Sequence, residues 1–310
     1  MKLKNYHVLL LGLILGFVSC NKDDDGSTTV AERDRVEQQV TDRDSLMGYF
    51  ETHYYNASTF TSPGNYTLSD LVISELPTDD DGNYLELPDP ENNTLLIDAV
   101  ETHTTTYQET EYEYYILRLN QGGGDMPHFS DSVLVNYSGN TMDEEVFDST
   151  INADTDFDLL GVIPGWREVL PQFNASTSFV ENGDGTVTYE NYGFGAMFLP
   201  SGLGYFSSAQ TDIPSYSNLI FKFELYQTEV NDHDSDGVPS YLEDLDGDKD
   251  LYNDDTDEDE VPNFLDVDDD GDDVLTKHED LDNDGDPTND LNADGVPLYL
   301  DENSTESNQD

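Results

Sequence analysis

Residues 130–170 read SDSVLVNYSGNTMDEEVFDSTINADTDFDLLGVIPGWREVL, and the order of segments in this stretch decides the fold that we expect. Val133–Gly139 has the branched and aromatic residues of a strand, with a turn at its end. Val146–Thr150 and Phe157–Leu159 follow as two shorter apolar segments. A branched pair and a Pro-Gly turn then lead to Trp166, the only tryptophan of the chain. The stretch predicts a sheet and a short helix that carries Trp166.

The segments on either side extend the predicted sheet. Thr110–Leu119 is rich in Tyr, Ile and Leu and alternates with polar residues, which predicts a strand. Gln121–Asp125 contains three glycines. Because no Lys-Ser/Thr pair opens a helix after these glycines, we expect a turn and not a phosphate-binding loop. Asn182–Gly185 predicts the tip of a hairpin, and Asn218–Leu225 predicts a last strand.

Aromatic and branched residues recur through these segments and could form the walls of an apolar hollow above Trp166. Because a proline ring is apolar and rigid, such walls would suit it as a ligand. For any one of these residues alone, membership in the ordinary core of a sheet explains its type equally well. The candidate pocket residues are Tyr137, Phe147, Phe157, Val162, Ile163, Trp166, Tyr205, Ile213 and Phe221.

Taken in order, these motifs resemble those of the FKBP-type peptidyl-prolyl cis-trans isomerases, over residues 112–228. The chain departs from the family pattern at Val169, where the family has glycine, and at Phe206, where glycine follows the tyrosine. Residues 174–197 are longer than in the family by about a hairpin. The motifs are Val135-Asn136-Tyr137-Ser138-Gly139, Val146-Phe147-Asp148-Ser149-Thr150, Phe157, Val162-Ile163-Pro164-Gly165-Trp166-Arg167-Glu168-Val169-Leu170, Pro200 with Leu203-Gly204-Tyr205, Ile213-Pro214, and Leu219-Ile220-Phe221-Lys222-Phe223-Glu224-Leu225.

The resemblance implies an α+β fold in which an antiparallel sheet wraps on a short helix. It implies catalysis of the cis-trans isomerisation of X-Pro bonds in polypeptide substrates, with no cofactor. A twisted amide is less dipolar than a planar amide, so an apolar pocket favours the transition state. By the same resemblance, Asp148 and Tyr205 are polar contacts in the pocket. Alternatively, Asp148 only caps the turn before Ser149.

Residues 1–20, MKLKNYHVLLLGLILGFVSC, predict an export signal. Lys2 and Lys4 precede an apolar run at Val8–Val18 that is short for a membrane span. The run ends at Cys20, the only cysteine, so an intrachain disulfide is excluded. The segment resembles a bacterial lipoprotein signal. We therefore expect Cys20 to become the first residue of the mature protein and to anchor it in a lipid bilayer.

Asn21–Asp25, with the sequence NKDDD, resembles the signal that sends lipoproteins to the cell surface in Bacteroidetes-type bacteria. We expect an outer-membrane lipoprotein that faces the cell surface, and the periplasmic face is the alternative. A solvated tether without a sorting function would have the same composition.

Residues 30–108 lack the motifs described above. Val36, Val40, Met47 and Phe50 recur at helical spacings and predict a helix from about residue 30 to residue 56. Clusters of Pro, Gly, Asn and Asp at 57–108 predict irregular loops and short strands. The predicted divisions are 1–19, a signal peptide; 20–29, an acidic tether; 30–108, a helical and irregular region; 109–230, the isomerase domain; 231–302, Asp-rich repeats; and 303–310, a disordered end.

The net charge of −58 is concentrated at the C-terminus, where residues 231–310 hold 31 of the 69 acidic residues and only two lysines. Such a chain repels phosphate backbones, which argues against nucleic acid as a partner. The segment cannot bury a core of its own unless something neutralises its carboxylates.

Residues 232–243 fit the template D-x-D-x-D-G-x₅-E in full, and alternate carboxylates of this kind can surround one Ca²⁺. Three further segments repeat the template with substitutions, which are Glu260 or Asp273 in place of the glycine, and Asn292 and Asp301 at the third and last positions of 290–301. The region resembles the calcium-binding repeats of thrombospondin type 3, without their cysteines. No flanking segment looks like a full amphipathic helix, so paired EF-hands are not expected. A disordered acidic spacer is the alternative. The candidate Ca²⁺ ligands are Asp232, Asp234, Asp236 and Glu243; Asp255, Asp257, Asp259 and Asp266; Asp268, Asp270, Asp272 and Glu279; and Asp290, Asn292, Asp294 and Asp301.

The sequence thus favours an anchored prolyl isomerase of exported or surface proteins with a Ca²⁺-binding tail. Two other functions stay open. The first is a binding module without catalysis, in which the pocket and the acidic repeats hold a partner. The second is a chaperone in which residues 30–108 grip unfolded chains.

Overall fold

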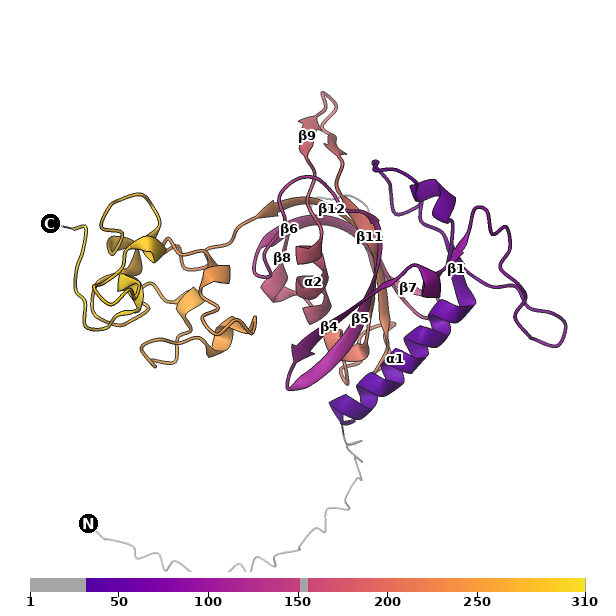
Figure 1. The fold of residues 1–310 in the computed structure, drawn as a ribbon, viewed down its shortest axis with the longest axis horizontal. Coiled ribbons are helices and arrows are strands. Elements are labelled where there is room, and N and C mark those ends of the chain that lie inside the picture. Colours follow the sequence, from indigo (N-terminus) through magenta and orange to yellow (C-terminus); the bar gives the residue numbers. More distant parts are fainter. Residues whose placement is uncertain (1–31, 151–155, 310) are drawn as a thin grey trace, which may run out of the picture. The chain divides into compact units, whose positions relative to one another are not determined.

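The centre of the computed structural model, which describes residues 32–150 and 156–309, is an antiparallel sheet that curves around a short helix (Figure 1). The predicted signal peptide, Cys20 and the predicted acidic tether lie outside the described residues. The strand order in the seven-stranded sheet is β4-β5-β11-β12-β6-β7, and β8 pairs with β6. The strands are β4 Glu101–Tyr107, β5 Thr110–Asn120, β6 Ser132–Thr141, β7 Val146–Ser149, β8 Asp156–Asp158, β11 Gly193–Leu199 and β12 Leu219–Glu229.

Both faces of this sheet are buried, because its central strands carry apolar residues at successive positions. On β5, Tyr114 and Ile116 point to a core that includes Trp166. Their neighbours Tyr115 and Leu117 point to a second core on the opposite face. Successive side chains of a strand lie on opposite faces. The sheet therefore needs a cover on each side, and a different part of the chain supplies each cover.

Helix α1, Arg35–Thr52, covers the second face. The Asp34 side chain caps its start by accepting a hydrogen bond from the Glu37 backbone N–H at 3.0 Å. The Phe50 ring packs edge to face on Tyr115 and Phe198, with centroids 4.9 Å apart in both pairs. The helix therefore completes the core of the sheet, and it lies within the segment where the sequence predicts it.

A smaller sheet follows α1, with the strand order β2-β1-β3. Its strands are β1 His53–Tyr55, β2 Ile73–Glu75 and β3 Thr94–Leu95. Loops and the 3₁₀ turn Ala57–Phe60 join them, and the 3₁₀ turn Leu96–Asp98 follows β3. These elements agree with the short strands predicted for this region.

Strand β4 is the element in residues 57–108 that the sequence analysis did not anticipate. It pairs with β5 along its whole length, from Glu101 opposite Ile116 to Tyr107 opposite Thr110. Its sequence, ETHTTTY, has no aliphatic residue, because it is an edge strand with every second residue exposed. The predicted boundary between 108 and 109 falls in the turn of this hairpin, so residues on both sides of it share one sheet.

The glycine of the Tyr137-Ser138-Gly139 motif does not form the predicted turn. Strand β6 continues to Thr141, and Gly139 pairs with both β7 and β12. A Cβ atom at Gly139 would lie 2.6 Å from the Phe221 ring and 2.8 Å from the Phe147 ring. Glycine is needed here because two aromatic rings approach the strand closely.

The predicted Pro-Gly turn is also different in the structure. Pro164 and Gly165 are the first two residues of α2, Pro164–Val169. Proline suits this position because the first backbone N–H of a helix has no partner within the helix. A Cβ atom at Gly165 would lie 2.3 Å from Leu199, so glycine lets the helix approach the sheet.

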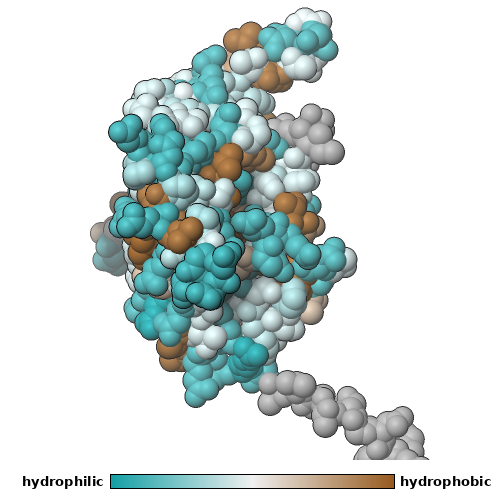
Figure 2. All heavy atoms as spheres, turned by 90° about the vertical axis from the view of Figure 1, so that its right-hand side faces the viewer, coloured by the Kyte–Doolittle hydropathy of each residue, from teal (hydrophilic) through white to brown (hydrophobic). Residues whose placement is uncertain are grey.

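Residues 174–197 contain the predicted hairpin, formed by β9 Ser178–Glu181 and β10 Val187–Glu190. It projects from the sheet in Figure 1 and forms the upper projection in Figure 2. Figure 2 shows a face that is largely hydrophilic, with hydrophobic residues in scattered small groups. Among the described residues, no helix combines the length and hydropathy needed to cross a membrane.

Residues 231–309, called the acidic tail below, contain loops and short 3₁₀ turns at near-regular intervals. Between the turns lie loops rich in Asp, and the few buried apolar side chains include Val238, Leu251 and Phe264. The turns are Ser240–Leu242, Leu251–Asn253, Asn263–Leu265, Thr276–His278, Pro287–Asn289 and Leu298–Leu300.

Candidate functional site

The Trp166 ring lies at the bottom of an aromatic cluster on the concave side of the sheet. Helix α2 places this ring against β6 and β12, and only 4% of Trp166 is exposed. Its centroid is 5.5 Å from that of Tyr137 and 5.1 Å from that of Phe221. The Phe157 ring from β8 lies 6.2 Å away. Three strands and one helix therefore converge on one indole ring.

The remaining apolar candidates surround this group. Phe147 packs edge to face on Phe221, with centroids 5.6 Å apart. Ile213 is buried in the same core, and Val162 and Ile163 pack against it with partly exposed side chains. Partial exposure leaves Val162 and Ile163 accessible from solvent, whereas Ile213 is buried. Eight of the candidate residues belong to this one cluster: Tyr137, Phe147, Phe157, Val162, Ile163, Trp166, Ile213 and Phe221.

Asp148 supplies a carboxylate at the edge of the cluster. The Tyr137 hydroxyl donates a hydrogen bond to Asp148 Oδ2 at 2.5 Å, from β6 to β7. Burial, and then this hydrogen bond, raises the pKa of Tyr137, so the phenol keeps its proton and remains the donor. The Asp148 residue is exposed, so its carboxylate remains accessible from solvent.

Tyr205 lies at the rim, 36% exposed, on the loop that follows the 3₁₀ turn Ser201–Leu203. Burial, and then the charge of Asp148, raises the pKa of Tyr205. The next residue, Phe206, has φ of +48°. This is the position where the family has glycine, and the backbone has the left-handed conformation that glycine adopts at low cost.

Packing holds Phe206 in this conformation. Its ring is 5% exposed and lies 5.1 Å from the Tyr216 ring, edge to face. The Arg35 guanidinium of α1 lies over the Phe206 ring, 4.1 Å from its centroid. Helix α1 therefore contacts the loop that carries Tyr205, which no pattern in the sequence indicated.

The sequence analysis also missed Phe223 as a neighbour of the indole ring. Phe223 is fully buried, and its ring centroid is 6.3 Å from that of Trp166. The alternation along Asn218–Leu225 could have identified it, since Phe223 shares a face with Phe221. Its complete burial makes it a support for the indole and not a wall of the hollow.

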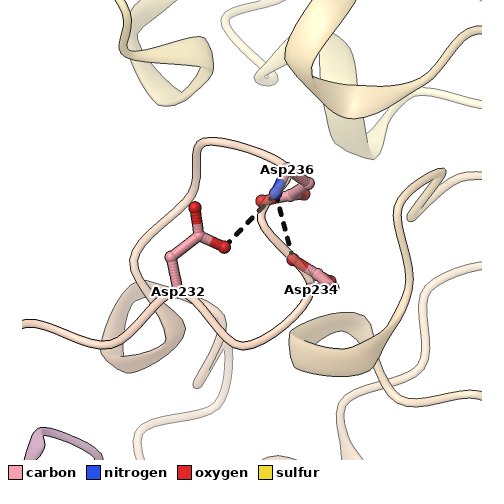
Figure 3. Close-up of side chains that lie close together, drawn as sticks. All are labelled: Asp232, Asp234 and Asp236. Carbon is pink, nitrogen blue, oxygen red and sulfur yellow. Dashed lines mark hydrogen bonds between the residues drawn. The ribbon is translucent and has the colours of Figure 1, made fainter.

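The acidic tail brings its carboxylates together in loops of one repeated geometry. In the first loop, 232–243, Figure 3 shows Asp232, Asp234 and Asp236 with their carboxylates around a common centre. One oxygen from each lies within 4.8 Å of the others. The Asp236 backbone N–H donates to Asp232 at 3.3 Å and to Asp234 at 3.2 Å. These bonds orient the carboxylates while leaving other oxygens available.

The same arrangement recurs in four further loops: loop 2 (244–254), loop 3 (255–266), loop 4 (268–279) and loop 5 (280–290). Each has a positive φ at its fourth and sixth positions. Asp255, Asp257 and Asp259 form one cluster, and Asp268, Asp270 and Asp272 form another. The residues with positive φ are Ser235, Gly237, Gly247, Lys249, Glu258, Glu260, Gly271, Asp273, Asn283 and Gly285.

Loops 2 and 5 were not among the predicted segments. In loop 2, Asp244, Asp246 and Asp254 lie within 4.8 Å of one another. In loop 5, Asp280 accepts a hydrogen bond from the Gly285 backbone at 2.9 Å, as Asp232 does from Gly237 in loop 1. Both loops place their last Asp at position eleven, so a search for an acid at position twelve passes over them. The run of alternate Asp residues alone would have found both.

Segment 290–301 does not repeat this geometry. Asn292 donates to Asp301 at 2.6 Å, and Asp294 is exposed. Burial, and then the charges of Asp282 and Asp280, raises the pKa of Asp290, which belongs with loop 5. The structure thus joins Asn292 to Asp301 in this segment, and the segment lacks the positive φ at the fourth position that loops 1–5 share.

The predicted closing residues of loops 1 and 4 are buried, whereas Asp266, the predicted closing residue of loop 3, is partly exposed. Glu243 is 0% and Glu279 is 1% exposed, and neither residue has a hydrogen-bond partner on either carboxylate oxygen. Burial, and then the charges of neighbouring aspartates, raises the pKa of Glu243 to about 10 and that of Glu279 to about 8. In loop 3, burial and then the charges of Asp259 and Asp266 raise the pKa of Asp257. Buried carboxylates of this kind require a cation or a proton.

The donor set fits a hard divalent cation. The loops offer oxygen atoms from several carboxylates, and Ca²⁺ takes six to eight oxygens at about 2.3–2.6 Å. Two oxygens on one such ion can be about 5 Å apart at most. In each cluster, one oxygen from every carboxylate lies within 4.8 Å of the others, which satisfies this condition.

Two family models match the chain. The FKBP-type peptidyl-prolyl cis-trans isomerase model covers residues 123–226, which include Trp166 and most of its aromatic neighbours. A model described as BamM C-terminal covers residues 233–308. The tail match is thus to a domain other than the thrombospondin type 3 repeat that the sequence resembles.

Three relatives match the same central region. FK506-binding protein 1A of Aspergillus fumigatus is 35% identical over 113 residues, which are 35% of this chain and 88% of that protein. The FKBP-type 22 kDa peptidyl-prolyl cis-trans isomerase of Escherichia coli is 32% identical over 112 residues, 35% of this chain and 47% of that protein. Outer membrane protein MIP of Legionella longbeachae is 34% identical over 110 residues, 34% of this chain and 40% of that protein. The chain thus spans less than half the length of the two bacterial relatives.

Proposed function

Because this chain belongs to the FKBP-type peptidyl-prolyl cis-trans isomerase family, we propose that residues 101–229, called the FKBP-type domain below, catalyse cis-trans isomerisation of X-Pro bonds. The observation that carries the proposal is the cluster on Trp166, in which eight candidate residues meet beside one carboxylate. The substrates would be proline-containing segments of exported or surface proteins.

The reaction requires little chemistry from the protein. Rotation about a peptide bond has a barrier of about 18–20 kcal/mol, because twisting breaks the amide resonance. Without a catalyst, an X-Pro bond takes tens of seconds to isomerise. A twisted amide is less dipolar than a planar one, so water stabilises the planar form more. Walls such as Phe147, Phe157 and Phe221 exclude that water and favour the twisted transition state.

Asp148 and Tyr205 would orient the substrate in this pocket. The hydrogen bond from Tyr137 fixes the Asp148 carboxylate at the edge of the cluster. A fixed acceptor can hold a polar group of the substrate backbone while the proline ring lies over Trp166. The Tyr205 hydroxyl at the rim is a second polar contact for the same backbone.

The test is a proline-peptide isomerisation assay with three proteins. The wild-type chain should accelerate isomerisation, and Asp148→Asn should lower the rate by about 10–100-fold, the range in which a lost orienting contact acts. Glu145→Gln is the matched control, since Glu145 is exposed on the turn between β6 and β7. It should retain the wild-type rate. Wild-type activity no higher than the blank would refute the proposal and leave a binding module without catalysis.

We also propose that loops 1–5 of the acidic tail bind Ca²⁺ as a structural ion. The supporting observations are the repeated backbone, the clustered oxygens and the buried carboxylates without partners. Within each loop, the alternate aspartates would supply the first ligands and the residue at position eleven or twelve would close the shell. Each ion would remove two negative charges. Calcium titration of the full chain by calorimetry tests this proposal, and an absence of binding heat would refute it.

The proposed location is the outer membrane, with Cys20 acylated and the protein facing the cell surface. The relative from Legionella longbeachae is named an outer membrane protein, which supports the proposed location at the outer membrane. Palmitate labelling of wild-type and Cys20→Ser cells tests the anchor, and labelling of both proteins would contradict it. Protease treatment of intact cells then separates the surface from the periplasmic face.

A further inference from the structure

Loop 4 contains a buried acid that the repeated geometry does not use. Its second residue is Asp269, which is 1% exposed. The second residues of the other loops are His233, Leu245, Thr256 and Leu281, none of which is acidic. Asp269 therefore needs an explanation beyond the ligand set of its own loop.

The backbone of Asp269 does follow the repeat. In loop 1, the His233 backbone N–H donates to the Ser240 hydroxyl at 3.2 Å. In loop 4, the Asp269 backbone N–H donates to the Thr276 hydroxyl at 3.4 Å, between the same two positions. The repeat thus fixes the backbone at position two and leaves the side chain free to vary. The Asp269 carboxylate is therefore not part of the repeated backbone geometry.

This carboxylate faces loop 1. One oxygen each from Asp236, Glu243 and Asp269 lies within 4.8 Å of the other two. Asp236 and Glu243 are both 0% exposed, so all three residues are more than nine-tenths buried. The cluster therefore joins two loops that are separated in sequence by loops 2 and 3.

Several oxygens in this cluster have no hydrogen-bond partner. They are Asp236 Oδ2, Asp269 Oδ1 and both carboxylate oxygens of Glu243. The other oxygens of the two aspartates are occupied, by the Val238 backbone N–H at 2.8 Å and by the Thr276 hydroxyl at 3.1 Å. Neighbouring groups thus hold each Asp carboxylate in place and leave one oxygen facing the other acids.

From this geometry we propose that the divalent cation of loop 1, of which Asp236 and Glu243 are already proposed ligands, is also bound by Asp269 of loop 4. Three buried carboxylates at this spacing repel one another unless a cation lies among them or protons neutralise them. A Ca²⁺ ion accepts oxygens at distances that fit the cluster. The ion would cross-link two loops, a role that the ligands within a single loop cannot perform. The inference rests on the proposed Ca²⁺ binding of the tail.

The experiment compares Asp269→Asn with the matched control Asp273→Asn, in calcium titrations of the full chain. Both changes remove one charge from loop 4, and Asp273 is exposed. Asp269→Asn should lose one bound ion or weaken one binding step by at least about tenfold, the loss expected when a group that a metal site depends on is removed. Asp273→Asn should bind as the wild type does. Equal isotherms for all three proteins would overturn the inference while leaving the loop sites intact.

Hydrogen exchange in saturating Ca²⁺ gives a second measurement. If the cation links the loops, Asp269→Asn should speed amide exchange in residues 232–243, although the substitution lies in 268–279. Acceleration confined to loop 4 would contradict the cross-link and indicate a local role for Asp269. Wild-type protein that binds no Ca²⁺ would instead refute the proposed function of the tail, which distinguishes the two failures.

Discussion

The interior of the FKBP-type domain consists of apolar side chains, whereas the most buried groups of the acidic tail include carboxylates. Trp166, Phe198 and Phe223 are almost fully removed from solvent in the domain. In the tail, Glu243 and Asp269 are buried to the same degree. Burial of an apolar ring is favourable by itself, but burial of a carboxylate is costly unless a partner neutralises it. The domain therefore carries its own driving force for folding, whereas the buried carboxylates of the tail need a neutralising partner, which we propose to be Ca²⁺.

Removal of Ca²⁺ should show the largest difference between the two regions. With EDTA at pH 7.5, we expect the amides of residues 232–290 to lose their protection from hydrogen exchange. Those of β5, β11 and β12 should keep theirs, because their core contains no metal ligands. Exchange measured by mass spectrometry resolves the two regions. A tail that stays protected without Ca²⁺ would contradict the proposed difference between the two regions.

A substitution in the second core should instead destabilise the sheet of the FKBP-type domain and leave the acidic tail unchanged. Phe50→Ala removes a fully buried ring that packs on Tyr115 and Phe198. We expect the domain to lose about 3–5 kcal/mol of stability, the range for buried aromatic residues. Val40→Ala on the exposed side of α1 should stay within about 0.5 kcal/mol of the wild type. Urea unfolding with and without Ca²⁺ checks both variants, and a small effect of Phe50→Ala would mean that α1 is not part of the domain core.

The stability of the Ca²⁺-free tail should also differ from that of the FKBP-type domain in its dependence on pH. Burial raises the pKa of Glu243 to about 10 and that of Asp269 to about 9. The folded tail therefore binds more protons than the unfolded tail between pH 4.5 and 10, and its stability falls as the pH rises through this window. In EDTA, the tail should be better protected from exchange at pH 5.5 than at pH 8.5, after correction for the intrinsic exchange rate.

The FKBP-type domain has a group with the opposite dependence. The hydrogen bonds that Arg118 donates to Glu101 lower the pKa of Glu101, so this pair contributes stability at neutral pH that is lost on acidification.

The pH prediction for the tail has one contradicting outcome. If the Ca²⁺-free tail gained no protection on acidification, protons would not be able to replace the cation.

The smallest expected effect concerns the backbone of loop 3. Glu260 has φ of +80° at the position where loop 1 has Gly237. A left-handed conformation costs a residue other than glycine about 1–2 kcal/mol. Glu260→Gly should therefore stabilise the Ca²⁺-loaded tail by about 1 kcal/mol. Glu260→Gln is the control, since it removes the charge and keeps the conformational cost. Equal stability of the two variants would assign the effect to charge.

The sequence predicted the aromatic cluster because its motifs are rich in residue types that occur rarely. A single tryptophan, a Phe-Asp pair and a Phe-rich last strand identify their places in the sheet. It did not predict β4, because an edge strand of threonines carries no apolar pattern. Nor did it place α1 on the second face, since the helix buries Gln38, Gln39 and Asp42 together with its apolar residues.

In the tail, the template predicted three of the loops and missed two. Loops 1, 3 and 4 have an acid at position twelve, whereas loops 2 and 5 have their last Asp one residue earlier. The role of Asp269 was beyond any template, because its partners lie in another loop. A spacing rule describes contacts along the chain, and contacts between loops depend on how the loops pack.

The pairing of the sheet has a consequence for the order in which the protein can fold. Ile116 pairs with Met197 and Tyr137 pairs with Phe223, so the central contacts join distant parts of the chain. Contacts of this kind form slowly, because long segments must first be brought together. Strand β12 lies between β11 and β6, and it is the last strand of the sheet in the sequence. During synthesis, the sheet stays in two separate parts until Leu219–Glu229 is available to join them.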